Sequence, residues 1–275
     1  MSLERGRRRG GAASRASLVP AAVLGVFLGL PVVVLLGRGI AGVIAAPLDA
    51  AGMLAALQLS LVTTAVSLAL TVFLGTPVAL TLARRRPRGS ALLETIIDLP
   101  IVLPPAVAGL ALLLVFGRRG VVGEPLAALG FDIPFTTVAV ILAQTFVAAP
   151  FYVRAARAGF RAVDRDLEDA ARVDGAGEIA VFRTVTAPLA GGALAAGMVM
   201  TWARALGEFG ATILFAGSVL GTTQTMPLFV YAEFGAGQLD SSVVAASLLV
   251  AAAVAVLGAV RIIGWRTLDA FRPVD

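Results

Sequence analysis

The sequence predicts an all-α integral membrane protein with six transmembrane helices. Hydrophobic residues make up 59% of the 275 residues and charged residues only 14%, whereas soluble domains carry about 25% charge. The mean hydropathy is +0.94. The apolar residues fall in blocks of about 20, the length of helix that crosses a hydrocarbon core of about 30 Å. Membrane β-strands show short alternating patterns instead, so these continuous runs favour helices.

The expected spans follow one another along almost the whole chain. They are Leu18–Gly37, one within Leu54–Ala83, Ile96–Phe116, Phe135–Val153, Val185–Ala203 and Val243–Ile263. The chain is therefore expected to divide into a basic N-terminus (1–17), a transmembrane domain (18–265) and a short tail (266–275). No internal repeat and no second soluble domain is expected.

The first apolar run has two interpretations. A secretory signal peptide also begins with basic residues and continues with an apolar run. Here the run is long, contains Pro20 and Pro31, and is not followed by a clear small-residue cleavage site. A retained first span is the favoured interpretation.

Two segments predict irregular backbone at membrane depth. The third run contains Pro100, Pro104 and Pro105, and Phe209–Gly221 contains several glycines without the length of a span. Irregular backbone in a membrane is expected only where it is buried in protein or lines a cavity. A kink that shapes packing and a role in a pathway both remain open for the prolines. The glycine-rich segment is expected to be bent or re-entrant.

The arginines predict the orientation of the chain. Cytoplasmic loops of membrane proteins carry an excess of Lys and Arg, and this chain has arginine but no lysine. With a cytoplasmic N-terminus and six spans, 18 of the 22 arginines lie on the cytoplasmic side. Both termini and the loop 154–184 are therefore expected in the cytoplasm. Since topology explains the positive charge, no nucleic-acid partner is expected.

The composition excludes most catalytic chemistry. The chain has no Cys and no His, which removes disulfides, thiol nucleophiles, His-based metal sites and Ser-His-Asp catalysis. No metal site is expected. It also has no GxxxxGK[ST] phosphate-binding loop. We therefore expect a protein that is not itself an enzyme.

One polar segment, Leu167–Leu189, separates the fourth and fifth spans. Asp164 is a suitable N-cap for a helix with an acidic first turn, and Gly175 is expected to end or bend that helix. The alanines Ala170 and Ala171 leave one helix face shallow, so another surface could approach closely. A solvated loop helix and a docking surface are both compatible with these features.

The spacing within this segment resembles a known motif. Asp169-Ala170-Ala171, three residues, Gly175, nine residues and Val185-Thr186-Ala187-Pro188 resemble the EAA loop of binding-protein-dependent ABC transporter permeases. That pattern is Glu-Ala-Ala, three residues, Gly, nine residues and Ile-x-Leu-Pro. This chain has Asp for Glu at 169, Val for Ile at 185 and Ala for Leu at 187. The last change removes apolar bulk from local packing.

The resemblance implies the type I ABC importer permease fold, with a coupling helix in the loop at about 160–187 that docks on an ATPase subunit. The residues implied in ATPase coupling are Glu168, Asp169, Ala170, Ala171, Gly175, Val185 and Pro188.

Other stretches narrow the resemblance. Asp98–Gly109, Phe116–Gly120, Arg204–Thr212 and Thr223–Leu228 together look like molybdate/tungstate permeases, with sulfate permeases as close relatives. The resemblance covers roughly residues 54–263. It implies an oxyanion substrate, molybdate first, with tungstate and sulfate open.

Candidates for the translocation path or gate come from polar, proline and ionisable residues in the spans. Arg204 and Glu208 are four residues apart on one helical face, so they could neutralise each other or contact substrate. Further small polar residues of the spans (Ser60, Thr63, Thr64, Ser67 and Thr201) have helix packing as their favoured role. The candidates are Pro104, Pro105, Gln144, Arg204, Glu208 and Thr212.

The implied assembly is an importer in a prokaryotic inner or plasma membrane. It contains a second copy of this chain, two ABC ATPase subunits and an extracytoplasmic substrate-binding protein, all in or against the lipid bilayer. No cofactor is expected in this chain, because ATP and Mg would be bound by the ATPase. The alternative is a passive anion channel, or another polytopic membrane protein without ATPase coupling.

Overall fold

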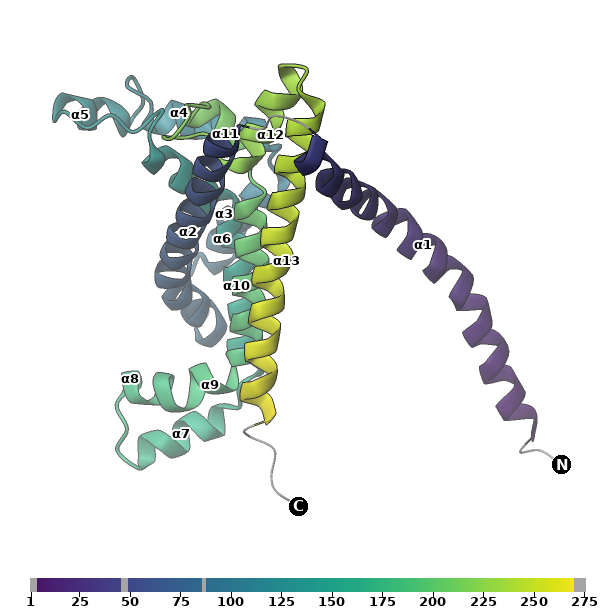
Figure 1. Ribbon diagram of the computed structural model, residues 1–275. Helices are drawn as coiled ribbons and strands as arrows, with labels where there is room; N and C mark the ends of the chain where they lie inside the picture. Colours follow the sequence, from purple (N-terminus) through teal and green to yellow (C-terminus); the bar gives the residue numbers. More distant parts are fainter. Residues whose placement is uncertain (1–3, 46–48, 86–87, 270–275) are drawn as a thin grey trace.

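The computed structural model describes residues 4–45, 49–85 and 88–269, and this part of the chain is helical with short connecting turns. The elements are labelled in Figure 1. They are α1 (Glu4–Ala45), α2 (Ala50–Arg84), α3 (Ser90–Val102), α4 (Pro105–Phe116), α5 (Gly123–Ala128), α6 (Thr137–Ala162), α7 (Arg165–Val173), α8 (Glu178–Val181), the π-turn η1 (Phe182–Thr186), α9 (Ala187–Leu189), α10 (Gly191–Leu206), α11 (Gly210–Phe215), α12 (Met226–Gly235) and α13 (Leu239–Asp269).

The centre of the molecule is formed by α2, α6 and α10, and α6 packs along both of the other two. Small residues let these backbones approach, as is usual between membrane helices. Gly75 of α2 lies against Tyr152 of α6, and Gly159 and Gly197 lie where α6 meets α10. Tyr152 also exchanges a 2.7 Å hydrogen bond with Thr76. The polar residues of α2 therefore serve the packing of the bundle.

The predicted number of six spans is confirmed when each of two bent helix pairs is counted as one span. Four helices are long and apolar enough to cross a membrane, and two bent helix pairs bring the total to six. The third span is not the single helix expected over 96–116, because α3 and α4 are bent by 119°. Leu103 and Pro104 are extended at the break, since the residue before a proline avoids helical backbone. α3 also begins earlier than expected, at Ser90.

The fifth span also differs from the expected range of 185–203. Residues 178–189 form a separate short helical segment that is bent by 75° relative to α10. The straight span therefore begins at Gly191 and runs to Leu206. We call residues 178–189, which lie beside α7, the elbow, and the first part of the predicted membrane segment belongs to it. Pro188 lies in α9, directly after η1 and near the end of this segment.

The order of the spans agrees with an even number of crossings. In Figure 1 the start of α1 and the end of α13 lie at the same end of the molecule as α7 and α8. The side of the membrane on which this end lies remains the prediction from the arginines. The proposed basic N-terminus and polar tail fall partly on residues 1–3 and 270–275, outside the described residues.

At the opposite end, α4, α11 and α12 lie across the top of the bundle (Figure 1). α4 packs on α11 at backbone distance, because Gly109 faces Ala211 and Gly210 faces Pro105. The bent element predicted for 209–221 is confirmed: after α11 the chain turns through Gly217 and Gly221, which have positive φ.

α1 diverges from the bundle and contacts it only near its C-terminal half (Figure 1). There the Ser247 hydroxyl of α13 donates a 2.9 Å hydrogen bond to the Leu35 carbonyl. Gly39 permits this approach, because a Cβ at that position would overlap the Ser247 side chain. Large apolar side chains of α1 between Val19 and Val34 are exposed.

Candidate functional site

The candidate site is the segment α7–α8–η1–α9, at the end of the bundle where α2 and α6 finish. α7 begins after Asp164, whose carboxylate accepts a 3.0 Å hydrogen bond from the Asp166 N–H, as predicted for an N-cap. It ends at Gly175, which has φ +91°. The Ala176 N–H then closes the turn onto the Ala171 carbonyl at 2.9 Å. Both predicted helix boundaries are confirmed.

The residues of the predicted coupling group do not share one environment. Asp169, Ala170 and Gly175 are exposed and Ala171 is half-buried, so this part of the surface is free for a partner. Glu168 is only 4% exposed. Although it was grouped with the coupling residues, it faces the bundle and does not belong to the outward surface.

Glu168 is held by two elements that are remote in sequence. Its Oε1 accepts a hydrogen bond of 2.5 Å from Nη2 of Arg84, at the end of α2. The same oxygen accepts one of 2.6 Å from the Thr186 hydroxyl in η1. Arg84 Nη1 also donates to the Val163 carbonyl at 3.2 Å, where α6 ends. One ion pair thus joins α2, α6, α7 and η1.

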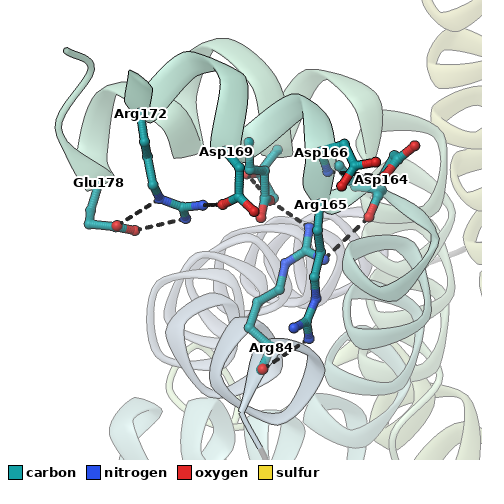
Figure 2. Close-up of polar contacts among 10 residues, drawn as sticks. Arg84, Asp164, Arg165, Asp166, Asp169, Arg172 and Glu178 are labelled. Carbon is teal, nitrogen blue, oxygen red and sulfur yellow. Dashed lines mark hydrogen bonds and ion pairs between the residues drawn. The ribbon is translucent and has the colours of Figure 1, made fainter. Parts of the chain in front are cut away.

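Two further arginines, one in α6 and one in α7, donate hydrogen bonds to backbone carbonyls at the end of α2. Arg165 Nη2 donates to the Arg84 carbonyl at 3.1 Å, and Arg161 Nη2 donates to the Leu82 carbonyl at 3.3 Å. The last carbonyls of a helix have no partner within it, and cations are favoured there. Figure 2 shows Arg84 and Arg165 side by side beneath α7. These arginines were interpreted only as topology signals from the sequence, and their structural role was missed.

Near the end of α7, Arg172 bridges two carboxylates (Figure 2). It pairs with Asp169 at 2.6 Å and with Glu178 of α8 at 2.9 Å. The hydrogen bonds to Glu178 and Asp169 raise the pKa of Arg172 above its ordinary value. The hydrogen bonds and charge of Arg172 lower the pKa of Glu178. This bridge spans the turn at Gly175 and links α7 to α8.

The remaining predicted coupling residues lie in the elbow. Val185 is half-buried within η1, and Pro188 is exposed in α9. Between Gly177 and Ala187 the chain forms a second short helical stretch, α8 followed by η1. Ala187, where the motif has leucine, is half-buried.

The predicted path and gate residues fall in two other places. Arg204 and Glu208 form a 2.7 Å ion pair at the end of α10, and the Glu208 carboxylate is 1% exposed. Its other oxygen accepts a 2.8 Å hydrogen bond from the Ala211 N–H, which begins α11. Both carboxylate oxygens are thus occupied. Pro104 and Pro105 lie at the exposed break between α3 and α4.

Gln144 and Thr212 are buried in the bundle. Gln144 Nε2 donates to Thr64 at 3.4 Å, while Gln144 Oε1 and Thr212 Oγ1 have no hydrogen-bond partner among the described residues. The small polar residues of the spans are also buried. They support packing contacts, such as the 2.7 Å bond from the Met226 N–H to Ser60. None of them lines an open path in this conformation.

Within the described residues, no three His, Cys, Asp or Glu side chains are grouped as a metal ion would require.

Comparison with known proteins adds independent findings. Residues 72–270 match the family described as the binding-protein-dependent transport system inner membrane component. The molybdenum transport system permease protein ModB of Mycobacterium tuberculosis is 48% identical over 178 residues, which cover 65% of this chain and 67% of that protein.

Two further relatives differ in how much of the chain they match. The probable transport system permease protein NifC of Clostridium pasteurianum is 42% identical over 174 residues, which cover 63% of this chain and only 61% of NifC. The sulfate transport system permease protein CysW of Synechococcus elongatus is 34% identical over 254 residues, which cover 88% of each chain.

A solved structure shares the fold. A chain of a bacterial ABC transporter that imports the acidic polysaccharide alginate superimposes with a TM-score of 0.72 at 17% identity, over 97% of this chain and 99% of that one. A second alginate transporter structure, in complex with a pentasaccharide-bound periplasmic protein, gives 0.71 at 17% identity, over 94% and 96% of the two chains. At this identity the match concerns the fold alone.

Proposed function

The chain belongs to the binding-protein-dependent transport system inner membrane component family, and we propose that it moves molybdate across a prokaryotic cell membrane as the permease subunit of an ATP-driven importer. It is an ABC importer permease with a multi-pass helical membrane domain. The substrate, the energy coupling and the assembly described below are parts of the proposal.

The relatives favour molybdate within the oxyanion class. The molybdenum permease ModB is 48% identical in its matched region, whereas the sulfate permease CysW is 34% identical, although over more of the chain. Tungstate has the same charge and tetrahedral shape as molybdate, so the proposal includes it as an alternative substrate. Competition binding to the partner binding protein, with molybdate, tungstate and sulfate as probes, distinguishes the three.

The observation that carries the coupling proposal is the division of α7 into two sides. Its inner side is fixed to the bundle through Glu168, Arg84 and Thr186. Its outer side presents Asp169, Ala170 and Gly175 to solvent. A helix of this kind can be pushed by a partner and pass the displacement to the ends of α2 and α6. We assign that partner as an ABC ATPase, which would bind the ATP and Mg.

The other predicted coupling residues would shape this surface without contacting the partner through charge. Ala171 keeps the face shallow, while Val185 and Pro188 set the course of the elbow that follows. Glu168 is reassigned from partner contact to internal attachment, because it is buried.

The path is proposed to form between two copies of this chain. Within one copy, the break at Pro104 and Pro105 and the buried amide and hydroxyl of Gln144 and Thr212 are the groups that an opening bundle would expose. The Arg204–Glu208 pair would hold the outer gate region and not bind substrate, because both Glu208 oxygens already have protein partners. Selection of the anion would rest with the extracytoplasmic binding protein.

The cycle follows from a bundle with two states. ATP closes the ATPase dimer and moves the two coupling segments together, which favours the outward-facing state. The binding protein then releases its anion into the path, and hydrolysis restores the inward-facing state. Such a shift requires that the ATPase contact the two states with different free energies. Both termini and the coupling segment would lie in the cytoplasm, as the distribution of the arginines predicts.

Reconstituted uptake tests this proposal against a passive anion channel. In proteoliposomes that contain the chain, its ATPase and its binding protein, molybdate uptake should require ATP and the loaded binding protein. Uptake by the chain alone, down a gradient, would instead support the channel and overturn the coupling assignment.

A further inference from the structure

The helix α3 turns its charged residues toward the bundle and its large apolar residues away from it. Between positions 91 and 102, the residues that are not exposed are Glu94, Ile97, Asp98 and Pro100. The large apolar side chains on the other sides of the helix are exposed, from 37% at Ile101 to 80% at Val102. α3 therefore buries little apolar surface against the bundle, and its attachment depends on polar contacts.

Two ion pairs join α3 to α6. Arg157 Nη2 lies 2.5 Å from Glu94 Oε1, and Arg154 Nε donates to Asp98 Oδ1 at 2.6 Å. The carboxylates are four residues apart on α3 and the arginines three apart on α6, spacings that place each set on one helix face. Among the described residues, no other side chain of α3 forms a hydrogen bond or ion pair with a different element.

The two pairs are direct contacts within a membrane span. The recess between them has a volume of about 10 Å³, so at most one water molecule fits there. α3 and α4 together form one of the candidate broken spans. Ionisable residues within a span are costly, and they are by default candidates for a function.

α3 has a backbone joint at each end. Gly89, directly before the helix, has φ +88°, and its position carries no side-chain cap. At the other end Leu103 and Pro104 are extended, and α4 continues at 119° to α3. Neither end continues as a helix that would fix the axis of α3. The position of α3 therefore depends on its contact with α6.

α6 connects these pairs to the coupling segment. Arg157 lies within the last two turns of α6, which ends at Ala162, and α7 begins at Arg165. The Val163 carbonyl between these helices accepts a hydrogen bond from Arg84, which also holds α7 through its ion pair. A displacement of α7 therefore reaches the end of α6, where the arginines of the two pairs lie.

We propose that the two ion pairs fix α3 to α6, so that α3 follows the displacement of the coupling segment. The four paired residues are then positioning residues for transport. α3 leads into the break at Pro104, and irregular backbone at membrane depth is expected to be buried in protein or to line a cavity. Pro104 is exposed in a single copy, so the break faces the path of the assembled importer. This role rests on the proposed function, whereas the attachment of α3 to α6 does not.

A positioning role and a purely structural role have different consequences. If the pairs only stabilise the fold, breaking them lowers ATP hydrolysis and molybdate uptake together. If they position α3, hydrolysis stimulated by the binding protein persists while uptake falls, because the ATPase contact at α7 is unchanged. The ratio of molybdate imported to ATP hydrolysed therefore distinguishes the two roles.

The test uses the full assembly in proteoliposomes. Glu94→Gln combined with Asp98→Asn removes both charges and keeps the size of the side chains. Loss of one accessible ion pair shifts an equilibrium by up to about fivefold, so the ratio should fall about fivefold or more. Asp132→Asn is the matched control, because it removes an ion pair of 2.7 Å with Arg118 in the loop between α4 and α6. It should leave the ratio unchanged.

Spin labels measure the attachment of α3 itself. Labels on cysteines introduced at the exposed positions Leu92 of α3 and Ala196 of α10, in assemblies diluted with unlabelled chain, should give a narrow distance distribution. Glu94→Gln combined with Asp98→Asn should broaden it. Asp98→Arg combined with Arg154→Asp restores opposite charges, so it should recover the narrow distribution and the ratio, whereas either change alone should not.

Three outcomes would overturn the proposal. A narrow distribution in the variant without carboxylates would show that the pairs do not fix α3. A broad distribution with an unchanged ratio would make the pairs structural only. A folded charge exchange that recovers neither property would show that the pairing of charges is not what matters. Wild-type uptake that needs no ATP would instead refute the proposed function, and the distance distributions alone would then decide whether the pairs fix α3 to α6.

Discussion

Arg84 and Glu168, 84 positions apart in the sequence, form an ion pair of 2.5 Å that joins the end of α2 to the first half of α7. The two side chains are 16% and 5% exposed, so both charges are largely removed from water. The Thr186 hydroxyl, in η1, donates a second hydrogen bond to the Glu168 carboxylate. Among the described residues, this polar junction attaches α7 to the bundle, so a substitution that breaks it should have a large local effect.

Glu168→Ala is expected to loosen α7 from the bundle. Removing one partner of a buried ion pair costs about 3–5 kcal/mol, because the remaining charge has no partner. Arg84 retains some contact with water, so a value near the lower end is expected. Hydrogen exchange of residues 165–186 should show the loss of protection.

Asp169→Ala is the matched control for that substitution. The neighbouring carboxylate is 68% exposed, and such surface changes shift the free energy of unfolding by less than about 0.5 kcal/mol. Asp169→Ala should instead weaken ATPase binding while local protection stays unchanged. Equal loss of protection in both variants would contradict the assignment of Glu168 to internal attachment.

Gly175 should tolerate a residue suited to its backbone but not a large one. Its φ of +91° strains any L-residue, yet a Cβ there meets no atom within 4 Å. Asn accepts left-handed backbone better than most residues. Gly175→Asn is thus expected to cost about 1 kcal/mol and keep transport, whereas Gly175→Arg should insert into the membrane normally and lose both transport and ATPase co-purification. Normal transport by Gly175→Arg would exclude docking at this turn.

The bridge from Arg172 to Glu178 predicts a pH dependence. Arg172 lowers the pKa of Glu178 from its ordinary 4.5, so the bridge stabilises the segment fully above that value. The stabilisation is lost as the pH falls through the lowered pKa of the folded state, where the carboxylate becomes protonated. Above pH 5 the angle between α7 and α8 should not change.

Spin labels can measure this angle, because the chain has no natural cysteine. Labels on cysteines introduced at the exposed positions Asp166 and Ile179 should show a broader distance distribution in acid. Glu178→Gln should show the broad distribution at every pH. A distribution that is narrow in acid would mean that Arg172 does not set the angle.

Local sequence rules predicted the parts of the site that local interactions build. The N-cap at Asp164 and the helix end at Gly175 follow from a side chain and a backbone preference within a few residues, and both were correct. The role of Arg84 could not be predicted in this way. Its partner lies in another helix, and a terminal arginine of a span is equally well explained by topology.

The breaks in the third and fifth spans show a second limit of prediction from the sequence. Hydropathy averages over about 20 residues, so the runs at 96–116 and 185–203 appeared continuous. The prolines at 104 and 105 indicated where the third span bends, but not by how much. The bend before α10 has its corner at Ala190, between Pro188 and the pair Gly191-Gly192, which indicate a break but not its angle. It depends on how α8 and η1 pack against α6 and α7.

Glu208 is expected to be structural. Glu208→Ala would leave Arg204 without its partner and the Ala211 N–H without an acceptor, at a cost of about 3–5 kcal/mol. Glu208→Gln keeps a neutral acceptor for Ala211 and should cost less. Thermal unfolding should therefore rank wild type above Gln and Gln above Ala. If Glu208→Ala unfolds like the wild type but loses molybdate uptake, the residue contacts substrate instead.

Gly109 tests how tightly α4 is seated on α11. A Cβ at this position would lie 2.6 Å from the Ala211 carbonyl oxygen and 2.9 Å from its Cα. These are backbone atoms, which cannot rotate away as a flexible side chain can. Gly109→Ala is therefore expected to force the two helices apart and to cost about 1–3 kcal/mol, the usual effect of overpacking. Gly192→Ala in α10 is the control, because a Cβ there meets nothing within 4 Å and alanine favours helix over glycine by about 0.5–1 kcal/mol. Thermal unfolding in detergent should show opposite shifts for the two variants. A stabilising Gly109→Ala would mean that α4 does not rest on α11 in the folded protein, and the end of the bundle opposite α7 would then need a different arrangement.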